Sequence, residues 1–176
     1  MIFAQEAVAG VWLVTPELRE DSRGFFARTW CEREARALGL NERWVQSSLS
    51  YTMKKATLRG LHFQRAPHEE VKLVRCTAGA ILDVIVDLRP DSPTFKKHFA
   101  IELNAVNRLA VYIPQGCAHG YQTLLDGAEV LYQMSEFYAP EASAGVRWDD
   151  PAFGISWPDP TPIMSDRDRN YPDFIS

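Results

Sequence analysis

Short stretches in which apolar and polar residues alternate recur along this chain, and their spacing constrains the fold more than any other feature. In residues 81–89 the even positions are all Leu or Val, whereas Asp83 and Asp87 lie among the odd positions. A period of two indicates an extended strand with two different faces. Many short strands at about ten-residue spacing predict an all-β sandwich or small barrel. Further strands are expected at residues 8–16, 43–52, 57–64, 98–103, 109–114 and 128–138, with turns at residues 78–79, 91–93, 104–107, 114–120 and 126–127.

Only one segment is typical of a helix. Residues 31–38 are rich in Ala, Glu, Arg and Leu, which favour helices, and Gly39 suits the position just after a helix end. From residue 140 the chain is rich in Pro and Asp, which predicts irregular structure wrapped on the barrel. We therefore expect one domain over residues 1–176, with a barrel core at about 44–139 and an irregular tail at about 140–176.

Composition excludes several classes of partner. The 19 Lys and Arg against 23 Asp and Glu give a net charge of −4, which argues against nucleic-acid or membrane-surface binding. No apolar run approaches the ~20 residues of a membrane span, and the N-terminus lacks the features of a signal peptide. The three cysteines are widely spaced and fit neither a disulfide framework nor a zinc site, so a cytoplasmic setting is expected.

Residues 57–74 concentrate the chemistry. They contain Arg59, His62 and Lys72, with a turn at Pro67, so these side chains are expected on two adjacent strands that face a common cavity. A lone His62 is more often a buried histidine bonded to a carbonyl, but Arg59 and Lys72 are costly to bury unless an anion pairs with them. Histidine also has the pKa best suited to proton abstraction near neutrality. The stretch therefore predicts a base beside an anion site.

Three other polar residues receive structural interpretations. Asp83 and Asp87 are expected on a solvated or salt-bridged face, with Arg75 or Arg89 as partner. The spacing of Tyr132 favours a core residue with its hydroxyl at the rim over a proton donor.

Residues 114–120, PQGCAHG, resemble the second half-motif of the cupins, whose fold is a small jelly-roll or double-stranded β-helix barrel. Many cupins bind a metal through this histidine, here His119, together with an H-x-H pair and a Glu. The first half of this chain has His62-Phe63-Gln64, so the second histidine is missing. Because a metal needs three or four converging ligands, no metal is expected. The alternative for His119 is a turn residue that caps a strand end.

Six ordered blocks, over roughly residues 10–170, resemble the dTDP-4-dehydrorhamnose 3,5-epimerases. The resemblance implies a nucleotide-diphosphate sugar with a C4 ketone as substrate. A base removes a proton beside the ketone and an acid returns one on the opposite face, without metal or redox cofactor. The blocks are residues 59–64, 72–76, 87–94, 113–120, 148–151 and 157–158.

The resemblance also implies individual roles. His62 is the base, Tyr132 the acid, and Lys72 stabilises the enolate. Asp168 orients and charge-balances His62, with Asp166 as the rival for that role. These are the expected catalytic residues.

The implied binding set lies around this centre. Arg59 and His119 hold the diphosphate and sugar. The family forms homodimers that exchange N-terminal strands, so part of the nucleotide site comes from the partner chain. The residues expected at the nucleotide are Arg23, Phe26, Gln46 and Tyr138.

This chain departs from the family pattern at the nucleotide end. Arg28 and Ser143 replace glutamates, Ser48 replaces an asparagine, and Arg167 replaces a lysine. These four are therefore candidate specificity residues, and the nucleotide is less constrained than the epimerisation. Alternatives are a C3-only or C5-only epimerase on a GDP-, CDP- or other dTDP-linked sugar, a non-catalytic cupin that binds a sugar nucleotide, and a metal-dependent cupin.

Overall fold

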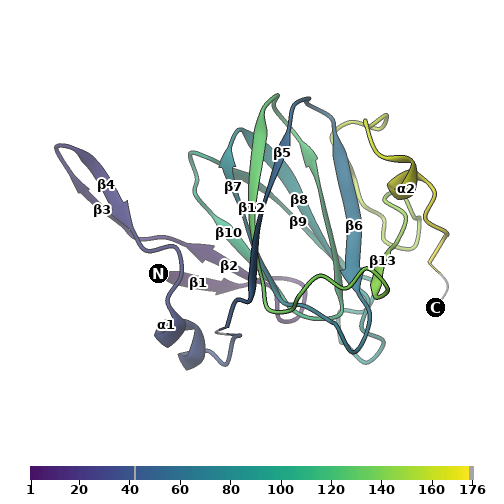
Figure 1. Cartoon of the computed structure of the whole chain (residues 1–176), viewed down its shortest axis with the longest axis horizontal. Coiled ribbons are helices and arrows are strands. Elements are labelled where there is room, and N and C mark those ends of the chain that lie inside the picture. Colours follow the sequence, from purple (N-terminus) through teal and green to yellow (C-terminus); the bar gives the residue numbers. More distant parts are fainter. Residues whose placement is uncertain (42, 175–176) are drawn as a thin grey trace.

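The structure is a computed structural model that describes residues 1–41 and 43–174, and two antiparallel sheets dominate it (Figure 1). The expected all-β, cupin-type barrel is confirmed. In spatial order the six-stranded sheet comprises β1 (Ile2–Gln5), β2 (Trp12–Thr15), β10 (Ala110–Ile113), β7 (Lys72–Ala78), β12 (Ala128–Met134) and β5 (Gln46–Thr52). The five-stranded sheet comprises β13 (Ser143–Gly145), β6 (Leu58–Gln64), β11 (Cys117–Thr123), β8 (Ala80–Asp87) and β9 (His98–Asn104).

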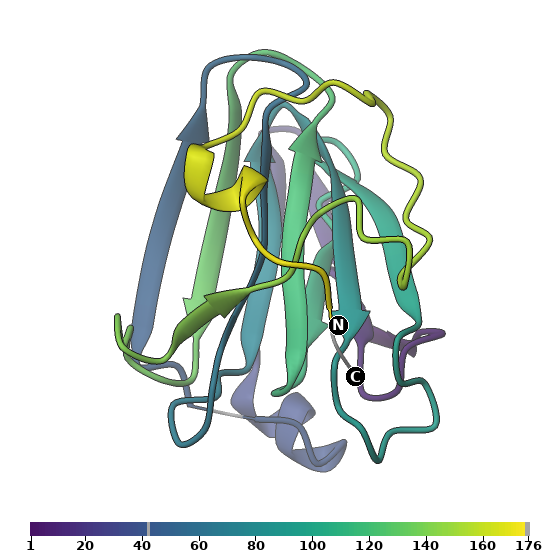
Figure 2. The ribbon, with the colours of Figure 1, turned by 90° about the vertical axis from the view of Figure 1, so that its right-hand side faces the viewer.

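The main core lies between these sheets, and a second core lies outside the five-stranded one. Val74, Val130 and Ile85 belong to the first, which draws on both sheets. Val84 and Val86 belong to the second, beneath the tail. The alternation in β8 is therefore real, but both of its faces are buried. Figure 2 shows the tail crossing the outer face of the five-stranded sheet, and this tail, expected to be irregular, contains β13 and a short helix at Asp166–Arg169.

The helix expected at residues 31–38 is confirmed as α1 (Glu32–Ala37). Gly39 has φ of +69°, and the Gly39 and Leu40 amides donate to the carbonyls of Arg36 and Ala35. This pattern is the Schellman motif, which a glycine with positive φ favours. Beside α1, the hairpin of β3 (Leu18–Asp21) and β4 (Gly24–Ala27) projects away from the two sheets (Figure 1).

Two sequence predictions about strands were wrong. Residues 114–120 are not all a turn, because β11 begins at Cys117, and all seven of its residues are buried in the centre of the sheet. A strand buried on both faces shows no alternation, and its glycine and histidine imitated a turn. The strand expected at residues 8–16 is only β2, preceded by a turn in which Gly10 has φ of +80°.

The cavity is lined differently from the sequence prediction. His62 and Lys72 lie on β6 and β7, which belong to different sheets, so they face the cavity from opposing walls instead of from adjacent strands. The backbones of β6 and β11 also approach closely at Gly60 and Gly120. A Cβ on Gly120 would lie 2.7 Å from the Arg59 carbonyl oxygen, so only glycine allows this approach. It brings the Cα atoms of His62 and His119 opposite each other.

Candidate active site

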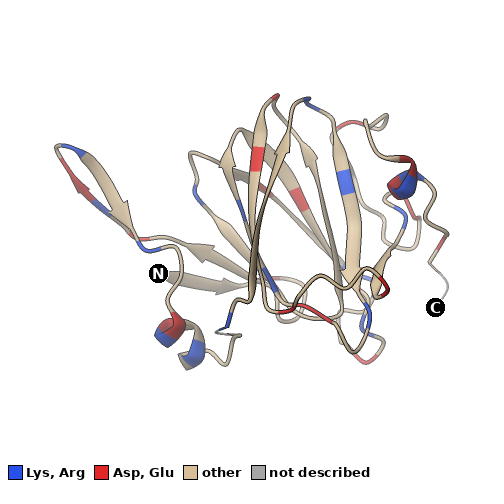
Figure 3. Cartoon of the chain, viewed as in Figure 1, with Lys and Arg blue, Asp and Glu red and all other residues tan. Residues whose placement is uncertain are grey.

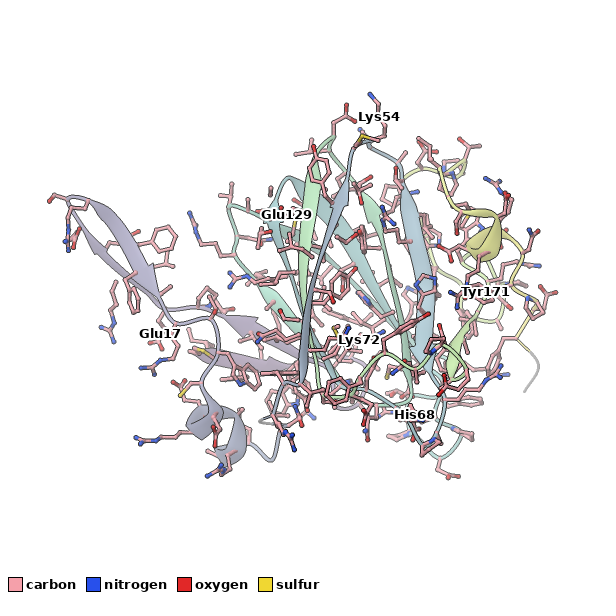
Figure 4. All side chains as sticks on the ribbon, viewed as in Figure 1. Glu17, Lys54, His68, Lys72, Glu129 and Tyr171 are labelled. Carbon is pink, nitrogen blue, oxygen red and sulfur yellow. The ribbon has the colours of Figure 1, made fainter. Side chains whose placement is uncertain are left out.

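A cavity of about 700 Å³ opens between the two sheets. It collects side chains from six strands, which are β5, β6, β7, β11, β12 and β13, and from the segment that leads into α2 (Asp166–Arg169). Figure 4 labels Lys72 in the body of the barrel and Tyr171 beside α2. The cavity brings together most of the sequence-predicted site: His62, Tyr132, Asp168, Lys72, Arg59, His119, Gln46, Ser48, Tyr138, Ser143 and Arg167.

His62 is paired with Asp168 at the cavity wall. The distance between His62 Nε2 and Asp168 Oδ1 is 2.7 Å, and the side chains are 40% and 7% exposed. Asp166, the rival in the sequence, lies exposed at the start of α2. Ser165 caps α2 by accepting a hydrogen bond from the Asp168 amide, which fixes the position of the carboxylate.

The electrostatics of this pair favour a proton acceptor. Burial raises the pKa of Asp168, but hydrogen bonds from His62 and the Gly60 amide outweigh it and hold that pKa below its usual value. The carboxylate is therefore ionised near neutral pH. An ionised carboxylate can only accept a hydrogen bond, so the Nε2 atom of His62 donates to it, and in a neutral imidazole Nδ1 is then the nitrogen able to take a proton.

A second histidine–aspartate pair lies deeper. His119 Nε2 is 2.7 Å from Asp83 Oδ1, and the side chains are only 4% and 0% exposed. His119 lies within β11, not at a strand end, and Asp83 lies on the neighbouring β8. The solvated or salt-bridged face expected for Asp83 and Asp87 is confirmed only for Asp87, which pairs with Arg89 at 2.8 Å; Asp83 is buried and bonded to His119 instead of an arginine. The available signal was that its carboxylate shares a face with the apolar Ile85, which points into the barrel.

Tyr132 faces the cavity from the opposite wall, on β12 of the six-stranded sheet. It packs on the main core, as its spacing indicated, but it also lines the cavity. Its ring lies edge-on to His119, with the ring centroids 6.0 Å apart. Burial, Tyr121 and Asp83 together raise the pKa of Tyr132 well above its usual value. The phenol is therefore protonated near neutral pH and able to donate.

The cavity also carries cations with different surroundings. Lys72 Nζ lies 3.0 Å from Glu70 Oε1. Arg59 donates to Thr52 Oγ1 at 3.1 Å, and Arg167 donates to Tyr171 and Ser143 at 2.9 and 2.8 Å. In the part of the chain that is described, neither arginine has a carboxylate within ion-pair distance. The burial cost expected for Arg59 does not arise, because Arg59 and Arg167 are both exposed. Their guanidinium groups are available to a bound anion.

The family model described as dTDP-4-dehydrorhamnose 3,5-epimerase matches residues 5–176 of this sequence. The chain belongs to the dTDP-4-dehydrorhamnose 3,5-epimerase family. The resemblance stated from the six blocks is thus confirmed. Its relatives in this family are epimerases, which are isomerases.

Individual relatives cover nearly the whole chain. The dTDP-4-dehydrorhamnose 3,5-epimerase of Salmonella typhimurium is 39% identical over 174 residues, which cover 98% of this chain and 94% of that protein. The dTDP-4-dehydrorhamnose 3-epimerase of Streptomyces niveus is 40% identical over 164 residues, covering 93% and 79%. A crystal structure of the 3,5-epimerase from Bacillus anthracis, with TDP and PPi bound, has a TM-score of 0.95 and 39% identity, covering 98% and 99%.

The remaining residues expected from the family do not reach the cavity. Arg23 pairs with Asp21 on the exposed hairpin turn, and Phe26 is 77% exposed. Arg28 pairs with Glu34 at 3.0 Å, within a separate cavity of about 410 Å³ near the N-terminus. Figure 3 shows both charge signs on the hairpin, and Figure 4 places Glu17 on that side of the molecule. One copy of this epimerase-family chain therefore leaves its hairpin residues away from its own 700 Å³ cavity.

Two features are absent from the described residues. No group of three or more His, Cys, Asp or Glu side chains there could hold a metal ion. No helix in residues 1–41 and 43–174 is long and apolar enough to cross a membrane.

Proposed function

We propose that this chain epimerises a nucleotide-linked 4-keto-6-deoxyhexose, converting dTDP-4-dehydro-6-deoxy-D-glucose to dTDP-4-dehydro-L-rhamnose. The observation that carries the proposal is the His62–Asp168 pair on one cavity wall with protonated Tyr132 on the other. The names of the relatives support the same reaction. A base and an acid on opposing walls are what inversion of a carbon centre requires.

In the proposed reaction, His62 Nδ1 removes the proton on C3 or C5, which the C4 ketone acidifies. The ionised Asp168 stabilises the imidazolium that forms. Tyr132 then returns a proton to the opposite face of the carbon, and its raised pKa keeps it protonated until then. Afterwards the imidazolium of His62 gives its proton to solvent water and the tyrosinate takes a proton from water, which restores both groups. All of these steps use protein side chains.

Three cationic side chains of the cavity bind the negative charges of the substrate. Lys72 faces the oxygen on C4, where negative charge develops in the enolate. Arg59 and Arg167 hold the diphosphate, because neither arginine has a carboxylate partner among the described residues. His119, fixed by Asp83 behind it, holds the sugar.

The residues expected at the nucleotide support dTDP less strongly than the residues around His62 support epimerisation. Arg28 is paired with Glu34, and Ser48, Ser143 and Arg167 also depart from the family pattern. At about 40% identity, relatives carry both the 3,5-epimerase and the 3-epimerase name, so identity alone does not choose between one carbon and two. The proposal therefore has C3-only epimerisation as its first alternative.

We propose that two copies share their nucleotide sites by exchanging N-terminal strands. The hairpin of β3 and β4 carries Phe25 and Phe26, which are 47% and 77% exposed. A second copy would cover these rings and bring Arg23 and Phe26 to its partner's cavity. Sedimentation equilibrium tests this assembly, and a monomer at micromolar concentration would contradict it.

We also propose that residues 1–176 form a single domain and that the protein is cytoplasmic. A single domain over residues 1–176 predicts that limited proteolysis trims the ends without releasing a stable fragment. A cytoplasmic setting fits the free cysteines Cys31, Cys76 and Cys117, and recovery from an exported fraction would contradict it.

The decisive experiment incubates the protein in D₂O with a panel of dTDP-, GDP-, CDP- and UDP-linked 4-keto-6-deoxyhexoses. NMR follows deuterium at C3 and C5 separately. Exchange at both carbons of the dTDP sugar is expected, and exchange at C3 alone selects the first alternative. Binding without exchange for every donor would reduce the chain to a sugar-nucleotide-binding protein.

A further inference from the structure

Glu70 is a cavity carboxylate for which the proposed reaction has no role. It precedes β7, and its Oε1 atom lies 3.0 Å from Lys72 Nζ, with both side chains only 11% exposed. The neighbouring Glu69 differs, because its backbone carbonyl accepts a hydrogen bond from Gln115 and its side chain does not line the cavity. Glu70 is therefore placed by the fold at the cation that faces the substrate.

A buried amide holds Glu70 in this place. Gln64 is 4% exposed, and its Nε2 donates to Glu70 Oε2 at 3.1 Å and to the His68 carbonyl at 2.9 Å. Its Oε1 accepts the Ala139 amide hydrogen at 2.7 Å. Gln64 thus ties the loop before β7 to the segment after β12, which leaves the Glu70 carboxylate little freedom.

The same contacts orient the ammonium group of Lys72. A lysine ammonium has three donor hydrogens. Glu70 accepts one, and the His62 carbonyl oxygen, 3.4 Å from Nζ, is placed to accept a second. One hydrogen is left for an oxygen of the ligand. Glu70 and the backbone of His62 therefore determine together where Lys72 donates.

Stability does not explain this arrangement. The attraction within a nearly buried ion pair is largely cancelled by the loss of hydration of the two ions, so such a pair stabilises the fold little. A carboxylate beside a cavity cation does, however, reduce the pull of that cation on other anions. In this cavity it leaves Arg59 and Arg167 as the cations without carboxylates, within the described residues.

We propose that Glu70 is a positioning residue for Lys72. It aims the ammonium at the oxygen on C4 and keeps Lys72 from binding the diphosphate in its place. The proposal rests on the proposed function for the role of Lys72. It predicts that removing the charge of Glu70 moves turnover and anion affinity in opposite directions.

The test compares Glu70→Gln with the matched charge control Glu69→Gln. In Glu70→Gln the unpaired Lys72 turns to phosphate, so kcat for C3 and C5 exchange falls about tenfold. Inorganic pyrophosphate, measured by calorimetry, binds about threefold or more tightly. The melting temperature falls, because removing one partner leaves the nearly buried ammonium of Lys72 without its carboxylate. Glu69→Gln leaves kcat and pyrophosphate affinity unchanged.

Each other outcome has a defined meaning. If the parent chain is active and Glu70→Gln keeps its kcat, the positioning role is wrong. If kcat and pyrophosphate affinity fall together, Glu70 is only structural and the proposal is wrong. If the parent chain exchanges no donor, the proposed function fails separately, and unchanged pyrophosphate affinity in Glu70→Gln then overturns the charge argument.

A second variant covers poor folding of Glu70→Gln. Glu70→Asp keeps the negative charge, but the side chain is one methylene group shorter, so the carboxylate lies farther from Lys72. It is expected to lower kcat without tightening pyrophosphate binding, because the carboxylate still repels anions. Parent-like kcat in Glu70→Asp would show that the position of the carboxylate does not matter, which contradicts the proposal.

Discussion

The two histidine–aspartate pairs of this barrel have the same bond and opposite surroundings. Nε2 and Oδ1 are 2.7 Å apart in both, and His62 and His119 are Cα partners on neighbouring strands. His62 is 40% exposed to the cavity, whereas His119 is 4% exposed. Exposure of the imidazole to the cavity, and not the geometry of its hydrogen bond to aspartate, therefore distinguishes the candidate base His62 from the fixed residue His119.

The source of each carboxylate explains the difference. Asp83 comes from β8, the central neighbour of β11, so its pair is built into the barrel. Asp168 comes from α2 in the tail, more than a hundred residues from His62 along the chain. The tail therefore completes the site from outside and leaves the other face of His62 open to the cavity.

Replacement of His62 is expected to have the largest effect. His62→Ala removes the proton acceptor and should lower deuterium exchange at C3 and C5 by about 10³-fold, as NMR in D₂O measures. Because His62 is partly exposed, the variant should fold, which circular dichroism checks. The matched change His119→Ala should retain more exchange and lose more stability. The reverse ranking would exchange the roles of the two histidines.

Asp168 should follow in size. Asp168→Asn replaces an ionised carboxylate by a neutral amide, which no longer stabilises protonated His62, and kcat should fall by about 10²-fold or more. Time courses of deuterium exchange at C3, stopped at intervals, measure this fall in kcat.

The control is the same change in the other pair. Asp83→Asn should act mainly on folding, because Asp83 is fully buried and bonded to His119. A loss of about 2 kcal/mol in the free energy of unfolding is expected from urea titration. Equal losses of activity and stability in the two variants would erase the distinction between the base His62 and the fixed residue His119.

Sequence reasoning reached one pair better than the other for a physical reason. His62 was found from Arg59 and Lys72 beside it in the sequence, and the alternation in residues 81–89 gave the strand. Asp83 was misplaced, because the tail buries the outer face of β8 and both faces are then interior. Asp168 carries no local signal, since only the folded tail brings it to His62. The resemblance alone supplied it.

Tyr132→Phe tests whether the residue on the opposite wall has a role separate from that of His62. The phenol is proposed to return the proton, so net epimerisation should fall by about 10²-fold, while deuterium exchange by His62 falls less. Coupled NMR of product formation and exchange separates the two rates. Equal losses in both would place Tyr132 at proton abstraction and remove the division of labour between the walls.

Asp87 is a third buried carboxylate, on the same strand as Asp83 but without a histidine. Its replacement should have the smallest effect on activity and act on stability alone. Burial raises its pKa, but hydrogen bonds from Arg89, Ser92 and Thr94 outweigh this and lower it to about 2. In the unfolded chain an aspartate has a pKa of about 3.9. The folded state therefore gains stability from this group above pH ~4, and loses that gain as the pH falls towards about 2.

The difference between these two pKa values corresponds to about 2.6 kcal/mol. Asp87→Asn should therefore be about 2.6 kcal/mol less stable than the parent chain at pH 7. This difference should shrink between pH ~4 and ~2.5, because the parent chain itself is losing the ionised carboxylate there. Urea unfolding at the three pH values measures it. A difference that stays constant with pH would mean that Asp87 stabilises the fold through packing and not through its charge. Asp87 would then differ from Asp168, whose charge is proposed to act on His62.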